Sequence, residues 1–439
     1  MRQRQSIIVF LACFSILYCS CSHQIRPHTL AKIFDRSVIS NDHFTGFALY
    51  DMDQQKMIYE LNSDKYFTPA SNTKLFTFYT CLRMLGDSIP GLKYVIRNDS
   101  LIFWATGDPS FLHSELKGLK GYELLEHAHQ KLFFSSGFQL SDFYGSGWAW
   151  NDYNDDYQAE ISEFPLEDNV AVFSAAVNGR LQVSPAALSI YLKCDCNFKP
   201  SNFEVVRNLL NNTFVYPAMP VPANFRQVVP WKASPALSLS LLVDTLRKPV
   251  YEVHLPMPVD AKTVNNANAD TVYRHMLQPS DNFIAEQLLL VCSAVKFKVL
   301  NTDSVIKYAT ANYLNDLPDK PQWVDGSGLS RYNLFTPRSI VKLLCKISDQ
   351  IKNDSLLHSL LPAGGVVGTI KSAYKTDRGL PFVWAKTGSL SNNHNQSGYL
   401  VTRKGRHLAF SFMNNNFTRP SHEIRDEMVR VMTFLHDNY

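Results

Sequence analysis

The sequence contains few of the residue patterns that bind metals, nucleotides or nucleic acids. Only 8 of its 439 residues are cysteines, no C-x-x-C pair is repeated, and the 13 histidines include no H-E-x-x-H spacing. The chain also lacks a glycine-rich phosphate loop, an internal repeat and a stripe of basic residues. We therefore expect no metal, no cofactor and no nucleic-acid partner.

Long apolar runs are also scarce, and the one that stands out lies at the amino terminus. Two arginines precede the apolar stretch Ile7–Tyr18, which is too short for a comfortable membrane span and ends in small residues and cysteines. Residues 1–21 therefore predict an export signal and a periplasmic protein. Cys21, flanked by serines, resembles a bacterial lipoprotein acceptor and would attach the chain to a membrane. Tyr18 stands where such acceptors usually have leucine, and plain secretory cleavage is the alternative.

The amino-acid composition limits the possible folds but does not identify the protein. Apolar residues make up 45% of the chain, enough for a large core in two or three domains. The formal charge of +4 falls to +2 without the two signal arginines, which neither favours nor opposes an anionic partner. Cys81, Cys292 and Cys345 fit core positions on helices, whereas Cys194 and Cys196 can form an exposed pair.

Three short strings occur in the order S-x-x-K, S-D-N and K-T-G, at residues 71–74, 280–282 and 386–388. Each alone also fits an ordinary turn or helix start. Ser71 differs from other S-x-x-K serines because a loop containing Pro69 precedes it and an apolar helix follows it. The same pattern also begins at five other positions, namely Ser114, Ser293, Ser304, Ser339 and Ser372.

Ser71 and Lys74 are three residues apart, so on a helix the lysine amine can reach the serine hydroxyl. A lysine at its reference pKa of about 10.4 is neutral in about one molecule in a few thousand at pH 7. Lys74 can act as a base only if its pKa is lowered, and burial and a second cation at Lys386 are the available causes. The pair therefore predicts a serine nucleophile with a lysine base.

The other two strings contain the remaining groups that peptide cleavage requires. Ser280 can relay a proton to the leaving amine, and Asn282 has the donor and acceptors needed to orient the lysine and the substrate amide. We expect Lys386 to stay charged and, with the Thr387 hydroxyl, to suit a substrate carboxylate. Gly388 lets the strand backbone approach the substrate closely.

Acyl transfer also requires donors for the carbonyl oxygen while it is negatively charged. The backbone N–H groups of Ser71 and Ser389 are the candidates for this oxyanion hole. One such donor is typically worth about 10²–10³ in rate. The three strings thus describe one acyl-transfer site.

Together, the strings resemble the signature of penicillin-binding proteins and class A β-lactamases. Within that group the chain resembles the D-alanyl-D-alanine carboxypeptidase/endopeptidases of the S13 peptidase family, the class C low-molecular-mass penicillin-binding proteins. The resemblance covers most of the mature chain. Its further marks are Gly107-Asp108-Pro109, Trp148-Ala149-Trp150-Asn151-Asp152, residues 280–286, residues 325–331, Gly368-Thr369, residues 386–390 and Gly398-Tyr399.

The resemblance implies an α+β fold with a serine β-lactamase/penicillin-binding transpeptidase-like catalytic domain, an antiparallel sheet with helices on both faces. About two hundred residues separate the first two strings, many more than in a compact β-lactamase. We therefore expect largely β accessory domains inserted at residues 92–255, where short β-prone runs alternate with turn residues. The catalytic domain would then comprise residues 25–91 and 256–439.

The resemblance also implies a pocket for the cross-linking residue of the substrate. Asp152 would meet the distal amine of meso-diaminopimelate, Tyr157 would pack on its stem and Arg331 would meet its carboxylate. Leu390 would line the same pocket. For Asp152 and Tyr157 a structural role is an equal alternative, and for Arg331 a role in capping its loop is the alternative. The polar run 391–396 leaves the substrate preference at that edge open.

These features predict a serine D-Ala-D-Ala carboxypeptidase, a D,D-endopeptidase or both. The protein would act on peptidoglycan stem peptides through a Ser71 acyl-enzyme and would bind β-lactam antibiotics covalently. A β-lactamase is one alternative, although no E-x-x-L-N motif lies between the first two strings. A catalytically inactive wall-binding or antibiotic-sensing lipoprotein is the other, and the retention of all three strings argues against it.

Overall fold

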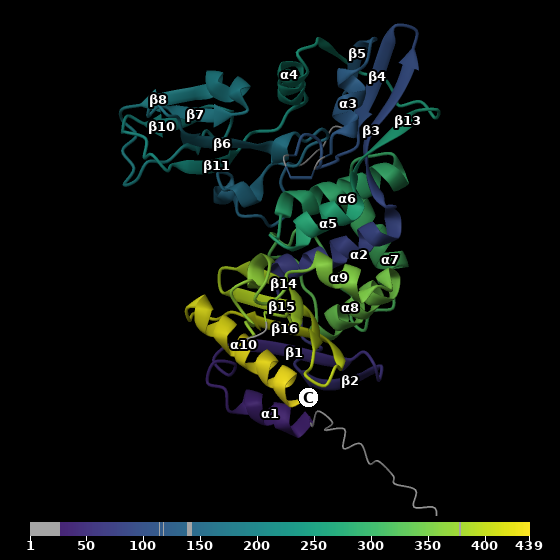
Figure 1. Cartoon of the computed structure of the whole chain (residues 1–439), viewed down its shortest axis with the longest axis vertical. Helices are drawn as coiled ribbons and strands as arrows, with labels where there is room; N and C mark the ends of the chain where they lie inside the picture. Colours follow the sequence, from purple (N-terminus) through teal and green to yellow (C-terminus); the bar gives the residue numbers. More distant parts are fainter. Residues whose placement is uncertain (1–26, 114, 117, 138–142, 377–378) are drawn as a thin grey trace, which may run out of the picture.

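The computed structural model describes residues 27–113, 115–116, 118–137, 143–376 and 379–439. The expected export signal and Cys21 therefore lie outside the described residues. Within these ranges no helix combines the length and apolarity needed to cross a bilayer. The chain forms a lower body around one sheet, a middle layer of helices and an upper, mostly β part (Figure 1).

The lower body is built on a five-stranded antiparallel sheet in the order β14-β15-β16-β1-β2. Alternate residues face opposite sides: Phe410 and Phe412 pack with α1 and α10, whereas Ala409 and Met413 pack with the middle helices. This confirms the expected antiparallel sheet with helices on both faces. The elements are β1 (Phe44–Asp51), β2 (Lys56–Leu61), β14 (Val383–Leu390), β15 (Asn393–Val401), β16 (His407–Asn415), α1 (Pro27–Asp35) and α10 (Ser421–Asn438).

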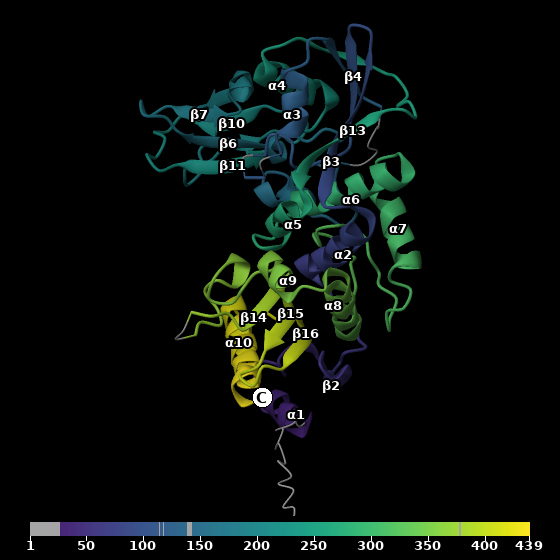
Figure 2. The ribbon, with the colours of Figure 1, turned by 45° about the vertical axis from the view of Figure 1, so that its right-hand side comes forward.

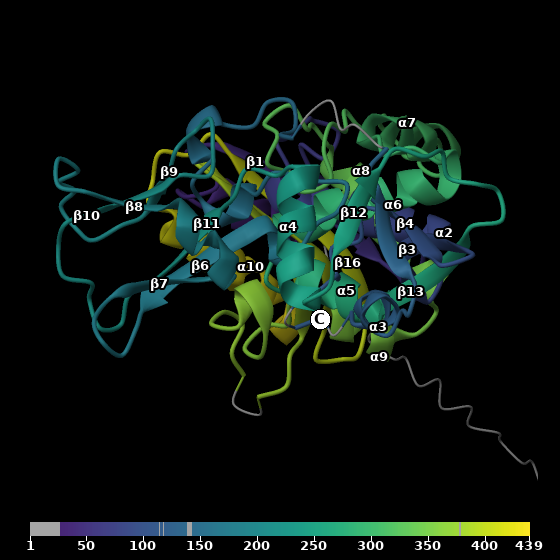
Figure 3. The same ribbon diagram turned by 90° about the horizontal axis from the view of Figure 1, so that it is seen from above.

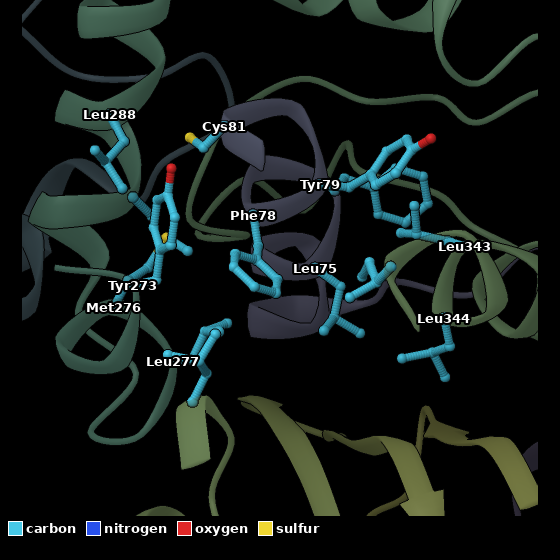
Figure 4. Close-up of a cluster of buried hydrophobic side chains, with 14 of the residues drawn as sticks. Leu75, Phe78, Tyr79, Cys81, Tyr273, Met276, Leu277, Leu288, Leu343 and Leu344 are labelled. Atoms are coloured by element: carbon cyan, nitrogen blue, oxygen red, sulfur yellow. The ribbon is translucent and has the colours of Figure 1, made fainter. Parts of the chain in front are cut away.

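The middle layer surrounds α2, the helix that follows Ser71. Its side chains from Leu75 to Cys81 are all buried, which explains why apolar residues are found on every side of this helix and not along a single stripe. Figure 4 shows Leu75, Phe78, Tyr79 and Cys81 between residues of α5, α6 and α8. The ring centroids of Phe78 and Tyr273 are 5.2 Å apart. The helices are α2 (Lys74–Met84), α5 (Ala269–Leu277), α6 (Asn282–Phe297), α7 (Thr302–Asn312), α8 (Pro337–Ile351) and α9 (Asp354–Leu360).

The upper part contains one five-stranded sheet, β12-β5-β4-β3-β13, and two three-stranded sheets, β11-β6-β7 and β8-β10-β9. The five-stranded sheet spans residues 88–268, because β3 and β13 pair with each other beyond the expected limits 92 and 255. The strands are β3 (Ser88–Arg97), β4 (Ser100–Ala105), β5 (Lys131–Ser135), β6 (Val170–Ala175), β7 (Leu181–Ser184), β8 (Leu192–Asp195), β9 (Val206–Arg207), β10 (Phe214–Pro217), β11 (Arg226–Pro230), β12 (Val250–Val253) and β13 (Lys262–Asn268).

Helices α2, α5 and α6 lie between the lower sheet and the upper sheets in both side views (Figure 2). Seen from above, β6 to β11 project to one side and β3, β4 and β13 lie on the other, with α4 between them (Figure 3). The remaining helices are α3 (Lys120–Glu126), α4 (Pro235–Leu246) and the short turns η1 (Ala70–Thr73), η2 (Trp150–Asp152), η3 (Asp156–Gln158), η4 (Glu167–Asn169), η5 (Ala186–Tyr191) and η6 (Gly368–Ile370).

The described cysteines are all free thiols. Cys81 of α2 and Cys292 of α6 are buried, with their Sγ atoms 3.8 Å apart, and Cys345 is half-buried on α8. Cys194 and Cys196 are exposed and are not paired with each other.

Candidate active site

Ser71 lies in the short turn η1, directly before α2, where the backbone is closely packed on two sides. Its neighbour Ala70 has a φ of 49°, in the left-handed region. A Cβ atom at Gly328 would lie 1.9 Å from the Ala70 carbonyl oxygen, and one at Gly388 would lie 2.4 Å from the Pro69 carbonyl oxygen. Both glycines are therefore required by the close approach of the turn that carries Ser71.

Lys74 is fully buried, and its Nζ donates three hydrogen bonds. The acceptors are Ser71 Oγ at 3.0 Å, Asn282 Oδ1 at 2.6 Å and the Ser327 carbonyl at 2.8 Å. A neutral amine keeps two N–H groups and one lone pair, and of the three partners only the Ser71 hydroxyl can itself donate. The lone pair of neutral Lys74 must therefore point at the Ser71 hydroxyl, as a general base requires.

Burial lowers the pKa of Lys74 to about 8, against the opposing effect of nearby carboxylates, first Asp281 and then Glu286 and Asp325. At this pKa about one molecule in ten is neutral at pH 7. Loss of hydration is thus the main cause of the shift, rather than the second cation that the sequence also allows.

Asn282 connects Lys74 to residues 88–268, the inserted part of the chain. Asp281 caps the start of α6 by accepting a hydrogen bond from the Ile284 N–H, which places Asn282 in its first turn. The Asn282 Oδ1 accepts from Lys74, and its Nδ2 donates to the Tyr157 carbonyl at 2.9 Å. Because that carbonyl can only accept, it fixes which way the Asn282 amide points.

The K-T-G residues lie on β14, the edge strand nearest the Ser71 turn. Asn72 Nδ2 donates to the Lys386 carbonyl at 3.2 Å, while Lys386 Nζ donates to the Thr387 carbonyl and Thr387 Oγ1 donates to Thr369 Oγ1. Burial and then Lys74 lower the pKa of Lys386 well below its usual value. Both causes work against the charged Lys386 that the sequence predicts, because each penalises the ammonium form.

A cavity of about 450 Å³ is lined by Ser71, Asn282 and the end of β14. The structure brings to it eight residues singled out from the sequence, whereas Lys74 and Lys386 lie beneath its surface. The Tyr157 hydroxyl donates to Asp155 at 3.2 Å, and Arg331 reaches the Ser391 carbonyl at 3.4 Å. The eight residues are Ser71, Asp152, Tyr157, Ser280, Asn282, Arg331, Ser389 and Leu390.

Comparison with known proteins shows the family to which this chain belongs. A sequence model of the D-Ala-D-Ala carboxypeptidase 3 (S13) family matches residues 29–189 and 263–435. The chain belongs to this family. The predicted family and enzyme class, a serine D-Ala-D-Ala carboxypeptidase, are therefore confirmed.

Relatives of this S13 protein extend over most of its length at low identity. The D-alanyl-D-alanine carboxypeptidase DacB of Haemophilus influenzae is 23% identical over 456 residues, covering 90% of each chain. The crystal structure of penicillin binding protein 4 (dacB) from H. influenzae has a TM-score of 0.68 at 23% identity, covering 94% of this chain and 98% of that one. The peptidoglycan endopeptidase Bd3459 of Bdellovibrio bacteriovorus has a TM-score of 0.51 at 14% identity, covering 89% and 92%.

The structure adds S13 residues around Lys74 to which the sequence assigned no role. The Ser327 carbonyl accepts from Lys74, and its N–H donates to Glu286 at 2.7 Å. Asp325 accepts from the Trp148 indole at 2.9 Å, which joins the inserted part to the loop carrying Ser327. Burial raises the pKa of Glu286 to about 7. Their only signal in the sequence is that they fall within the strings shared with the S13 family.

With Lys74 as the base, the rate of acylation of this S13 peptidase is expected to depend on pH. The reactive neutral amine becomes more abundant as pH rises, so the second-order rate constant for penicillin acylation should increase about tenfold between pH 6 and 7 and level off above about pH 8. Stopped-flow measurements with a fluorescent penicillin test this. A rate constant that is flat or falling between pH 6 and 8 would contradict Lys74 as the base.

Proposed function

We propose that this protein hydrolyses D-Ala-D-Ala termini and D-Ala–meso-diaminopimelate cross-links of peptidoglycan stem peptides through an acyl-enzyme on Ser71. The observation that carries the proposal is the buried Lys74, whose Nζ lies 3.0 Å from Ser71 Oγ. Asn282 and the Ser327 carbonyl accept hydrogen bonds from the two N–H groups of neutral Lys74, so its lone pair points at the Ser71 hydroxyl.

Acylation begins when neutral Lys74 takes the proton of Ser71 and the Ser71 oxygen attacks the carbonyl carbon of the scissile bond. The developing negative charge on the carbonyl oxygen is held by the backbone N–H groups of Ser71 and Ser389, both of which border the cavity. Ser280 relays the proton to the leaving amine. Water then releases the acyl group, and the same residues serve carboxypeptidase and endopeptidase cleavage.

The charges around the cavity suit a zwitterionic side chain. Asp152 and Arg331 border the same 450 Å³ space, which Tyr157, Ser389 and Leu390 also line. Asp152 would bind the distal amine of meso-diaminopimelate and Arg331 its carboxylate. Tyr157 and Leu390 would contact its methylene stem.

β-Lactam antibiotics would acylate the same serine, because they present a strained amide with a neighbouring carboxylate. Penicillin binding protein 4 of H. influenzae has been solved with a β-lactam. The predicted export signal supports a periplasmic location, where the wall polymer lies, and Cys21 would attach the chain to a membrane if it is acylated.

The products formed from intact, diaminopimelate-containing peptidoglycan test the proposal. We expect the purified mature protein to release D-alanine from pentapeptide stems and to convert cross-linked dimers to monomers, as measured by liquid chromatography and mass spectrometry. A matched digest pretreated with penicillin should give neither product. If the untreated protein releases no D-alanine and opens no dimer, the proposed function is wrong.

A further inference from the structure

His394, which lies outside the three strings, forms a hydrogen bond with Ser389, a residue that lines the active-site cavity. Ser389 follows the K-T-G string on β14, is exposed, and lines the active-site cavity together with Ser71. His394 lies directly opposite on β15, in register with Ser389, with its Nδ1 2.8 Å from Ser389 Oγ. A two-residue turn joins the strands, so the geometry of the pair is fixed by the sheet.

The His394 ring is held in the interior of the protein. It is 5% exposed, and its strand lies between β14 and β16. In register His394 pairs with Asn414 of β16, which places its ring on the sheet face that α10 covers. Burial, and then Arg425 of α10, lower its pKa to about 4. His394 is therefore neutral at pH 7, and it carries one N–H.

The surroundings of the other ring nitrogen, Nε2, determine which nitrogen of His394 carries the hydrogen. Within the described residues, Nε2 of His394 is buried and has no hydrogen-bond partner. If the hydrogen were on Nε2, a buried N–H would be left unsatisfied, which is rarer in proteins than an unsatisfied acceptor. The preferred tautomer therefore carries the hydrogen on Nδ1, which donates to Ser389 Oγ.

We propose that His394 is a positioning residue that holds Ser389 as a hydrogen-bond donor to the bound substrate. With one lone pair of Oγ occupied by the His394 N–H, the hydroxyl hydrogen of Ser389 must point elsewhere. Because Ser389 lines the cavity that also contains Ser71, a ligand bound there can accept this hydrogen. The acceptor there would be a carboxylate oxygen of the stem peptide or of a β-lactam, since an anionic oxygen is the strongest acceptor that either ligand offers.

The neighbouring strand residues strengthen this assignment. The Thr387 hydroxyl already donates to Thr369, and the Lys386 amine donates to the Thr387 carbonyl. Among these three polar side chains of β14, Ser389 is the one exposed to the cavity, whereas Lys386 and Thr387 are buried. This inference rests on the proposed function, because it concerns how that substrate is held.

Kinetics of His394→Phe and His394→Asn, with Ser389→Ala in both backgrounds, test the proposal. Phenylalanine keeps the ring and removes both nitrogens, whereas the asparagine amide can place a donor near the position of Nδ1. We expect His394→Phe to raise KM for a D-Ala-D-Ala peptide and to lower the penicillin acylation constant about five- to fiftyfold, with a smaller change in kcat. His394→Asn should recover most of this loss. Adding His394→Phe to Ser389→Ala should cost nothing further.

The outcomes separate this inference from the proposed function. If wild-type protein cleaves the peptide and His394→Phe has the same KM, the inference is wrong while the function stands. Equal losses from His394→Phe with and without the Ser389 hydroxyl would also overturn it, since the residue would then act through packing alone. A wild-type protein with no cleavage at all would instead refute the function. Thermal unfolding of each variant shows whether a loss of activity comes from misfolding.

Discussion

Ser71→Ala is expected to abolish covalent labelling by fluorescent penicillin and to lower kcat for D-alanine release by about 10⁴–10⁶-fold. The Ser71 hydroxyl is the proposed nucleophile, and none of the other cavity residues can replace it next to the Lys74 lone pair. The fold should be unaffected, because Ser71 lies at the cavity and loses one hydroxyl. Labelling on denaturing gels and a D-alanine assay measure both effects.

The matched control for this variant is Ser372→Ala. Ser372 also begins an S-x-x-K string, but it is exposed on the surface. We expect full labelling and full activity from the control, and a wild-type adduct that lasts many minutes rather than seconds. Covalent uptake of penicillin by Ser71→Ala would show that another residue is the nucleophile. Release of the adduct within seconds would indicate a β-lactamase.

Gly328→Ala is expected to damage both stability and catalysis. The new Cβ would lie 1.9 Å from the Ala70 carbonyl oxygen and 2.9 Å from Thr73 Oγ1, at a φ of +88° that alanine rarely adopts. Relief of this overlap must move the turn that carries Ser71. We expect the free energy of unfolding to fall by about 2–4 kcal/mol and the acylation constant to fall about a hundredfold.

Gly405→Ala separates backbone strain from the steric overlap at Gly328. Gly405 has a similar φ of +78°, but a Cβ there would have no neighbour within 4 Å. Its replacement should cost only about 1 kcal/mol of stability and leave acylation unchanged. Chemical denaturation gives the stabilities and stopped-flow labelling gives the rates. If the two variants behave alike, the close packing of residue 328 against the nucleophile turn is unimportant.

Local chemistry in the sequence predicts the centre of the site well. The Ser71–Lys74 contact follows from three-residue spacing on a helix, and the apolar residues after it predict the burial that lowers the lysine pKa. The sheet with helices on both faces follows from the family resemblance. These features depend on neighbours in the chain or on strings that the family shares.

Contacts between distant segments could not be predicted in this way. The Ser327 carbonyl is 253 residues from Lys74, and the Tyr157 carbonyl is 125 residues from Asn282. Both are backbone groups, which every residue type possesses, so no residue identity marks them. The lowered pKa of Lys386 has a related origin, since the depth of this residue beneath the cavity is a property of the whole fold.

The hydrogen bond from Asn282 to Tyr157 bears on how this enzyme can be engineered. Tyr157 belongs to the inserted part of the chain, yet its carbonyl sets the orientation of an amide that contacts Lys74. Excision of the insertion would leave the Asn282 amide free to rotate by half a turn and present its NH₂ group to Lys74. A minimal enzyme made from the lower body and middle helices would therefore need a substitute acceptor at this point.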